Sequence, residues 1–186
     1  MNHIGTKIIE TERLILRPFV MADASAMYEN WASDPEVTKY VTWPPHSSVE
    51  VTRMVMREWV DGYEEPDRYN WAIIPKGGED KPIGNISVIH IHENVDACEV
   101  GYCMGRAWWG GGIMTEALRA VVDYLFGNVG FNRICARHDT RNIGSGRVMG
   151  KAGMRYEGTL RQAARNNQGI VDVACRSILR EEWNKQ

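Results

Sequence analysis

The stretch EVGYCMGRAWWGGGIMTEAL, residues 99–118, decides the fold. Alternating residues at 98–104 predict a strand, glycines at 110–112 predict a tight loop, and apolar residues at helical spacing predict a helix over about 115–126. The first turn of a helix has free N–H groups and the positive end of the helix dipole. Glycines before it let a phosphate approach the backbone closely. The stretch is therefore a candidate diphosphate cradle, although a tight turn without function would contain similar glycines.

Two common phosphate-binding motifs do not fit these glycines. The Walker loop needs a lysine after its last glycine, and none follows Gly112. The dinucleotide motif Gly-x-Gly-x-x-Gly would need a glycine where the chain has Thr115. The loop therefore belongs to another class of site, if it binds phosphate at all.

The rest of the chain predicts helices around one mixed sheet. Further strands are expected over Ile8–Phe19, Tyr69–Ile74, Pro82–Ile91 and Phe131–His138, with two closing strands between Met154 and Leu179. Further helices are expected over Ala24–Trp31, Ser47–Tyr63 and Asn142–Ala152, with a short one beginning at Pro35. Ser47 and Glu50 have the spacing of a capping box. We expect one domain over residues 1–186.

Composition narrows the class of protein. The chain has 186 residues, 44% hydrophobic and 25% charged, which is typical of a folded protein and argues against disorder. A net charge of -2 argues against a general nucleic-acid binder. No apolar run reaches the roughly 18–20 residues of a membrane span, and the N-terminus does not resemble a signal peptide. The four cysteines form no C-x-x-C pair. Together with the absence of a signal peptide and of a membrane span, this predicts free thiols in a cytoplasmic protein without a membrane partner.

Residues 109–117, WGGGIMTEA, resemble the coenzyme A loop of the GCN5-related N-acetyltransferases (GNAT), and of their Rim-type branch in particular. Other motifs of that branch occur in the same order, namely TERLILRP at 11–18, EVGY at 99–102, NIGS at 142–145, and AGM at 152–154 followed by Glu157-Gly158. The resemblance covers nearly the whole chain. Met114 stands where glycine or alanine is usual, and Trp109 where arginine or glutamine is frequent. Only the backbone N–H of Met114 should matter to a phosphate, provided that its side chain points into the core.

The resemblance implies an α+β fold with helices on both faces of a mixed, mostly antiparallel sheet of about seven strands. Its fourth and fifth strands, here 99–104 and 131–138, should splay apart and hold acetyl-CoA as cosubstrate. The implied coenzyme-binding residues are Tyr102, Cys103, Met104, Trp109, Gly110, Gly111, Gly112, Ile113, Met114, Thr115 and Asn142. Asn142 fits equally well as a helix N-cap. Arg147 and Lys151 could meet the 3′-phosphate or form a solvated basic face.

The implied chemistry is direct attack of an amine on the thioester. Ser145 would give a proton to the leaving thiolate, and a backbone N–H near Cys103 would hold the oxyanion. Some Rim-type enzymes use a glutamate as base, but the matching residues 162–165 here contain no carboxylate. Glu99, His138 and Asp139 are substitutes by position, and Glu99 fits a structural role as well.

Other candidate residues point to weaker alternatives. His90 and His92 would share a strand face, but no third metal ligand is suggested, so we expect no metal site. Cys135 with His138 reads better as a buried strand cysteine than as a nucleophile pair. The aromatic residues Tyr40, Trp43 and Trp71 suit either an acceptor pocket or the core.

The resulting hypothesis is an N-acetyltransferase that acts on a primary amine, either a protein N-terminus or a small molecule. The alternative is a non-catalytic module that binds acyl-CoA, because the usual glutamate is absent. A phosphate-binding interaction domain is a third interpretation. The resemblance also implies a homodimer. The acceptor would be chosen by loops within residues 28–68, which the sequence does not decode.

Overall fold

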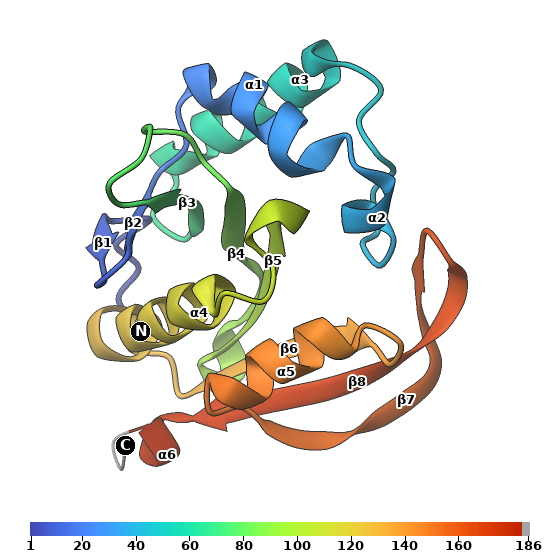
Figure 1. Ribbon diagram of the computed structural model, residues 1–186. Helices are drawn as coiled ribbons and strands as arrows, with labels where there is room; N and C mark the ends of the chain where they lie inside the picture. The colour runs from blue at the N-terminus through green and yellow to red at the C-terminus, as the bar shows by residue number, and fades with distance from the viewer. Residues whose placement is uncertain (184–186) are drawn as a thin grey trace.

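The computed structural model describes residues 1–183, so the last three residues of the predicted domain lie outside it. Its centre is one eight-stranded sheet in the order β1-β2-β3-β4-β5-β6-β8-β7 (Figure 1). The strands are β1 Ile9–Glu10, β2 Leu14–Arg17, β3 Asn70–Pro75, β4 Gly84–His92, β5 Ala97–Met104, β6 Arg133–Asp139, β7 Arg155–Asn166 and β8 Gly169–Leu179. Only the β5–β6 pair is parallel. The predicted mixed, mostly antiparallel α+β architecture is confirmed.

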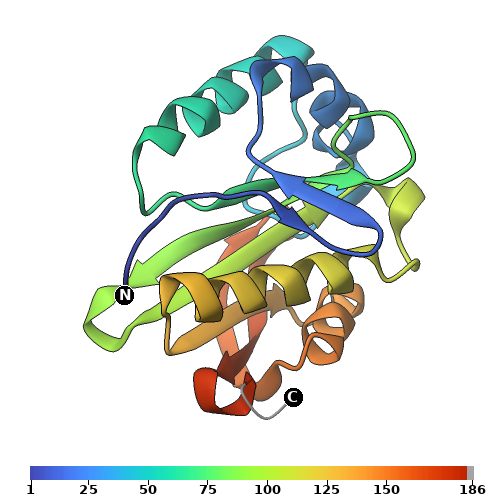
Figure 2. The same ribbon diagram turned by 90° about the vertical axis from the view of Figure 1, so that its left-hand side faces the viewer.

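Helices cover both faces of the sheet, as predicted (Figure 2). The α-helices are α1 Ala24–Met27, α2 Pro35–Thr38, α3 Val49–Asp61, α4 Ile113–Tyr124, α5 Ile143–Lys151 and α6 Arg180–Trp183. The helices α1 and α3 pack on one face, while α4 and α5 pack on the other. Helix α3 begins one residue later than its predicted capping box, because Ser48 and not Ser47 accepts the N–H of Val51. Among the described residues, no helix is long and apolar enough to cross a membrane.

The strand predicted over Ile8–Phe19 is instead two strands, which accounts for the eighth strand. Thr11 folds the chain back, because its N–H donates to the carbonyl of Leu14 at 3.0 Å and its hydroxyl accepts the N–H of Leu14 at 3.0 Å. The resulting β1 and β2 pair antiparallel. Hydroxyl side chains offer the backbone such local hydrogen bonds in turns.

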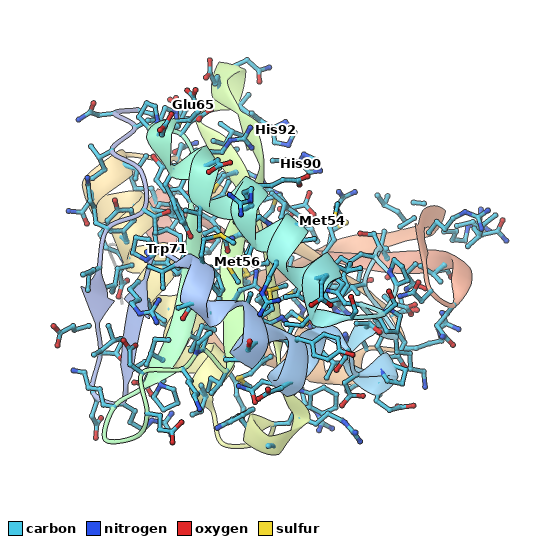
Figure 3. All side chains as sticks on the ribbon, turned by 90° about the horizontal axis from the view of Figure 1, so that it is seen from above. Met54, Met56, Glu65, Trp71, His90 and His92 are labelled. Carbon is cyan, nitrogen blue, oxygen red and sulfur yellow. The ribbon has the colours of Figure 1, made fainter. Side chains whose placement is uncertain are left out.

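The core has one cluster on each face of the sheet, and β3 is buried on both faces. Trp71 and Ile73 of β3 pack toward α4, whereas Ala72 and Ile74 pack toward α1 and α3. In the view of Figure 3, Trp71 and Met56 lie within the molecule, and Met56 of α3 is fully buried. Met54, two residues earlier on the same helix, is 70% exposed, so α3 has one inward face.

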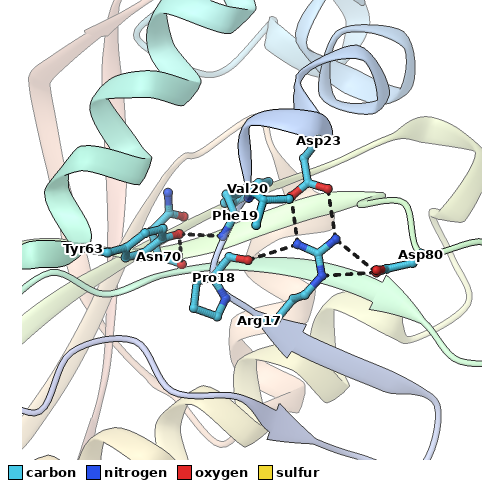
Figure 4. Close-up of polar contacts among 8 residues, drawn as sticks. All are labelled: Arg17, Pro18, Phe19, Val20, Asp23, Tyr63, Asn70 and Asp80. Carbon is cyan, nitrogen blue, oxygen red and sulfur yellow. Dashed lines mark hydrogen bonds and ion pairs between the residues drawn. The ribbon is translucent and has the colours of Figure 1, made fainter.

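An ion-pair network fixes α1 to the edge of the sheet (Figure 4). The guanidinium of Arg17 on β2 donates to both carboxylate oxygens of buried Asp23 at 2.8 and 3.0 Å. It also donates to exposed Asp80. The phenol of Tyr63 accepts the N–H of Phe19 at 2.9 Å and donates to the carbonyl of Asn70 at 2.6 Å. These bonds place the α1–α3 layer against the strands beneath it.

Candidate active site

The strands β5 and β6 separate after a short parallel ladder. Ala97, Cys98 and Glu99 pair with residues 133–135, and this pairing ends at Glu99. Beyond that point, residues 100–104 pair only with β4, while residues 136–139 pair only with β8. The predicted splay is therefore present, and one edge of β5 has free backbone groups. We call this opening the fork.

The glycine loop lies at the end of β5, directly before α4. Gly110 and Gly112 have φ values of 81° and 75°, in the left-handed region that costs other residues about 1–2 kcal/mol. A Cβ atom on Gly110 would meet nothing within 4 Å, so the loop backbone is open to a ligand. Gly112 is the N-cap of α4, and no side chain caps the first N–H groups of that helix. Met114 is buried in the core, as its place in the motif requires.

The side chains of Trp109 and Arg13 hold the loop in place. The indole N–H of Trp109 donates to the carbonyl of Met104 at 2.8 Å, so this half-exposed tryptophan ties the loop back to the strand. Arg13 donates to the carbonyl of Gly111 at 2.9 Å and forms an ion pair with Glu116 at 2.6 Å. Arg13 was not among the site residues expected from the sequence, and its place in the TERL motif is the one feature that could have indicated it.

Ser145 lies in the first turn of α5, which packs against α4 and against the strands β6, β7 and β8. The side chain of Asn142 caps this helix by accepting the N–H of Ser145 at 3.1 Å, so the capping interpretation of Asn142 holds. The phenolic oxygen of Tyr102 on β5 lies 2.9 Å from the Ser145 hydroxyl and 3.0 Å from the Ser145 carbonyl oxygen. Burial raises the pKa of Tyr102, so this phenol stays protonated. The structure thus joins Tyr102 and Ser145, which the sequence analysis treated separately.

Glu99 lies where the fork opens and is 6% exposed. Arg137 of β6 donates to both of its carboxylate oxygens at 2.9 Å. This ion pair therefore bridges the two strands at the point where they separate. A carboxylate has about four lone-pair sites, so Glu99 keeps acceptor capacity for water.

The two other base candidates have structural partners. Asp139 accepts hydrogen bonds from Arg141 and Asn166, and these lower its pKa to about 2. The His138 ring lies against α5, where a Cβ atom on Gly146 would come within 2.8 Å of its Nε2. Its Nδ1 lies 2.8 Å from the carbonyl oxygen of Asp139. Asp139 and one ring nitrogen of His138 are therefore engaged in local structure at the end of β6, whereas Glu99 lies where the fork opens.

The remaining sequence candidates fall in different places. Burial raises the pKa of Cys103 to about 12, so its thiol is protonated at neutral pH. Trp71 is fully buried in the core, whereas Tyr40 and Trp43 lie half-buried in the loop after α2. Arg147 and Lys151 are exposed on α5.

His90 and His92 are exposed on β4 and lie near each other in Figure 3. No group of three or more potential metal ligands occurs among residues 1–183. Burial raises the pKa of Cys135 on β6, which fits a strand cysteine better than a nucleophile.

The tip of the β7–β8 hairpin lies beside α2 (Figure 1), and hydrogen bonds join it to α2 and to the loop that follows. The side-chain amide of Asn167 donates to the carbonyls of Thr38 and Trp43, at 2.8 Å each. The backbone N–H of Asn167 donates to the carbonyl of Val41. A bulge in β7, with Gln162 at a φ of 51°, interrupts the pairing between Leu160 and Ala164. This bulge overlaps residues 162–165, which contain no carboxylate.

Comparison with known proteins agrees with this geometry. Residues 13–155 match the family model described as an acetyltransferase (GNAT) domain. The uncharacterized N-acetyltransferase p20 of Bacillus licheniformis is 33% identical over 173 residues, which cover 93% of this chain and 96% of that protein. A GNAT-family acetyltransferase from Bacillus anthracis has a crystal structure that matches with a TM-score of 0.83 and 29% identity, over 94% of this chain and 99% of that one.

A shorter similarity connects the chain with the [ribosomal protein uS5]-alanine N-acetyltransferase of Escherichia coli. The two are 33% identical over 76 residues, which cover 41% of this chain and 39% of that protein. The family model and the Bacillus licheniformis relative span most of the chain, and GNAT proteins use acetyl-CoA as cosubstrate. The chain therefore belongs to the GNAT family of acetyltransferases.

Proposed function

We propose that this protein transfers the acetyl group of acetyl-CoA to a primary amine. One observation carries the proposal: β5, whose edge is free beyond Glu99 at the fork, continues into the open glycine loop of α4. A strand edge with free backbone groups and an uncapped helix start are thus joined by a few residues. They match the two chemical parts of coenzyme A, an amide-containing arm and a diphosphate.

The backbone supplies most of the donor-binding groups. The free edge of β5 at Tyr102, Cys103 and Met104 pairs with the amides of the pantetheine arm, as an added strand would. The carbonyl of Met104 already accepts the indole N–H of Trp109, which orients the loop. The N–H groups from Gly110 to Thr115 bind the diphosphate at the positive end of α4.

Ser145 and Glu99 carry the proton transfers. Glu99 takes a proton from the attacking amine through water, and Ser145 donates its hydroxyl proton to the sulfur as the C–S bond breaks. The new C–N bond forms while the electron pair of the C–S bond stays on sulfur. The proton gained by Glu99 returns to Ser145 through water, so both groups are restored. Tyr102 orients the Ser145 hydroxyl, and the N–H beside Cys103 stabilises the oxyanion.

The acceptor enters between α2 and the β7–β8 hairpin. Asn167 joins these two segments, and Tyr40 and Trp43 lie beside the junction. The similarity to a ribosomal-protein alanine acetyltransferase favours a protein N-terminus, and a small-molecule amine is the other candidate class. A Rim-type assignment and a homodimer are further proposals, which rest on the sequence resemblance. A cytoplasmic location is also a proposal, and it rests on the composition and the cysteine spacing.

A thiol-release assay with a panel of amines tests this function. The panel contains short peptides with free N-terminal alanine or serine, polyamines and aminoglycosides. We expect release of coenzyme A to depend on one class of amine, and Glu99→Gln and Ser145→Ala to reduce kcat. Binding of acetyl-CoA without turnover of any amine would instead favour the non-catalytic acyl-CoA module.

A further inference from the structure

A cluster of residues that are far apart in the sequence lies beside the glycine loop. Glu116, in the first turn of α4, accepts the Thr11 hydroxyl at 2.6 Å, the N–H of Arg13 at 2.9 Å and the Nε of Arg13 at 2.6 Å. The Nη1 of the same Arg13 donates to the carbonyl of Gly111 at 2.9 Å. Arg13 therefore binds the helix and the loop before it at once.

This contact is distinctive within the loop. Among the hydrogen bonds of residues 1–183, it is the one that a side chain makes to the glycines at 110–112. Gly110 and Gly112 are in the left-handed conformation, and glycine is the residue with the greatest backbone freedom. A bond to the carbonyl of Gly111 fixes the peptide between them, and with it the direction of the neighbouring N–H groups.

The cluster also balances charge where an anion is expected. A carboxylate near the start of α4 would repel a diphosphate, and Glu116 is such a carboxylate. Although burial raises the pKa of Glu116, hydrogen bonds from Thr11 and Arg13 lower it overall, so it is ionised and paired. The remaining nitrogen of Arg13, Nη2, lies 3.6 Å from where a Cβ atom of Gly112 would be, on the loop side. Arg13 thus balances the charge of Glu116, and its Nη2 remains next to the loop as a hydrogen-bond donor.

We propose that Arg13 is a positioning residue for the acyl donor. It orders the glycine loop and offers a cationic N–H group to the diphosphate of the acyl carrier. The proposal rests on the proposed function, because it takes the loop as the diphosphate site. On this proposal, the preference for an acyl donor that carries a diphosphate depends on Arg13, which lies between β1 and β2. A thioester of the same pantetheine arm without the nucleotide gains nothing from Arg13.

The test compares two donors, acetyl-CoA and S-acetylpantetheine, which share the thioester but differ in the diphosphate. We expect Arg13→Met to lower kcat/KM for acetyl-CoA by about ten- to a hundred-fold, mainly through KM, since one charge-assisted hydrogen bond is lost. With S-acetylpantetheine, the variant should equal the wild type. Equal losses with both donors, or no loss with acetyl-CoA, would overturn the proposal.

Matched variants separate this role of Arg13 from a general effect of lost surface charge or of misfolding. Arg53→Met removes an exposed arginine that pairs only with Glu50 on α3, and it should change neither donor's kinetics. Thr11→Val and Arg13→Lys are milder changes for use if Arg13→Met does not fold. Arg13→Lys should recover only part of the acetyl-CoA preference, because lysine lacks the planar fork of donors.

A binding measurement gives a readout that does not depend on turnover. Calorimetric titration with 3′-phosphoadenosine 5′-diphosphate, the nucleotide half of coenzyme A, should give a Kd that Arg13→Met raises at least about ten-fold. Equal affinity of the two proteins would contradict the proposal. If the wild type neither binds this nucleotide nor uses acetyl-CoA, the proposed function itself fails, and that outcome differs from a failure confined to Arg13.

Discussion

The substitution Tyr102→Phe tests whether the proton donor is oriented from the sheet. It removes one oxygen atom and keeps the ring. The lost atom lies 2.9 Å from the Ser145 hydroxyl and 3.0 Å from the Ser145 carbonyl oxygen. Because the phenol bridges both groups, its loss frees the Ser145 side chain to rotate away from the fork. The change therefore acts on Ser145 without altering the loop that we propose as the diphosphate site.

The expected magnitudes follow from these two bonds. A neutral buried hydrogen bond contributes about 0.5–1.5 kcal/mol, so the variant should lose about 1–3 kcal/mol of unfolding free energy. For a chain of this length, the corresponding fall in Tm is about 3–10 °C. General acid catalysis contributes about a hundred-fold or more, so Ser145→Ala should lower kcat by about that factor and Tyr102→Phe by about ten-fold.

The assay is a double-mutant cycle on kcat, with KM for acetyl-CoA as an internal check. If Tyr102 acts through Ser145, the double variant should be no slower than Ser145→Ala alone. Tyr156→Phe is the matched control, because it removes an exposed hydroxyl whose hydrogen-bond partner among residues 1–183 is the Thr159 hydroxyl, at 2.8 Å, and keeps the ring that Arg176 covers. Multiplying losses in the double variant, or an unchanged kcat in Tyr102→Phe, would refute the reasoning.

Three further predictions concern the loop, the turn after β6 and the hairpin tip. Gly112→Ala should lose about 1–2 kcal/mol of unfolding free energy in chemical denaturation, because Gly112 has a φ of 75°, whereas Gly78→Ala should be near neutral. Since bonds from Arg141 hold the folded-state pKa of Asp139 near 2, below its unfolded value of 3.8, the unfolded state binds more protons in acid. Stability should therefore fall by about 2 kcal/mol as the pH drops from about 5 to 2, and Asp139→Asn should flatten that slope in acid titrations of Tm. Asn167→Ala removes the bonds to the loop after α2, so steady-state kinetics should show a several-fold higher KM for the amine and an unchanged KM for acetyl-CoA. A parallel rise of both constants would contradict that assignment.

The central motif was predictable because its information is local. The glycines at 110–112, the helix behind them and the strand before them all follow from residue type and spacing, and the structure has each of them in place. The separation of the strands 99–104 and 131–138 was expected from the resemblance. In the structure, their parallel pairing ends at Glu99. Periodicity also identified the other long strands and the helices α3 and α5.

Other features depend on contacts between distant residues, which no pattern within one segment reveals. The turn at Thr11 splits a strand that alternation predicted as continuous. Arg13 and Glu116 are 103 residues apart, so neither motif indicates that they form one cluster. Position alone made Asp139 a candidate base, yet its partners hold its pKa near 2.

The hairpin tip shows the same limit at the acceptor side. The segment 166–169 reads as an ordinary turn, and nothing in it predicts that Asn167 binds the loop after α2, more than a hundred residues earlier. Long-range hydrogen bonds of this kind join the two segments that we propose as the acceptor entrance. The choice of amine is therefore the part of the function that sequence patterns describe least.

Calorimetric titration of the purified protein with acetyl-CoA tests the central claim most directly, with Gly112→Trp measured beside it and Gly78→Trp as the control. We predict binding in the micromolar range by the wild type and by Gly78→Trp, which corresponds to about -8 kcal/mol, and loss of binding in Gly112→Trp. Circular dichroism would establish that all three proteins are folded. A folded wild type that does not bind acetyl-CoA, or a folded Gly112→Trp that binds as tightly as the wild type, would contradict the assignment of the coenzyme to this loop.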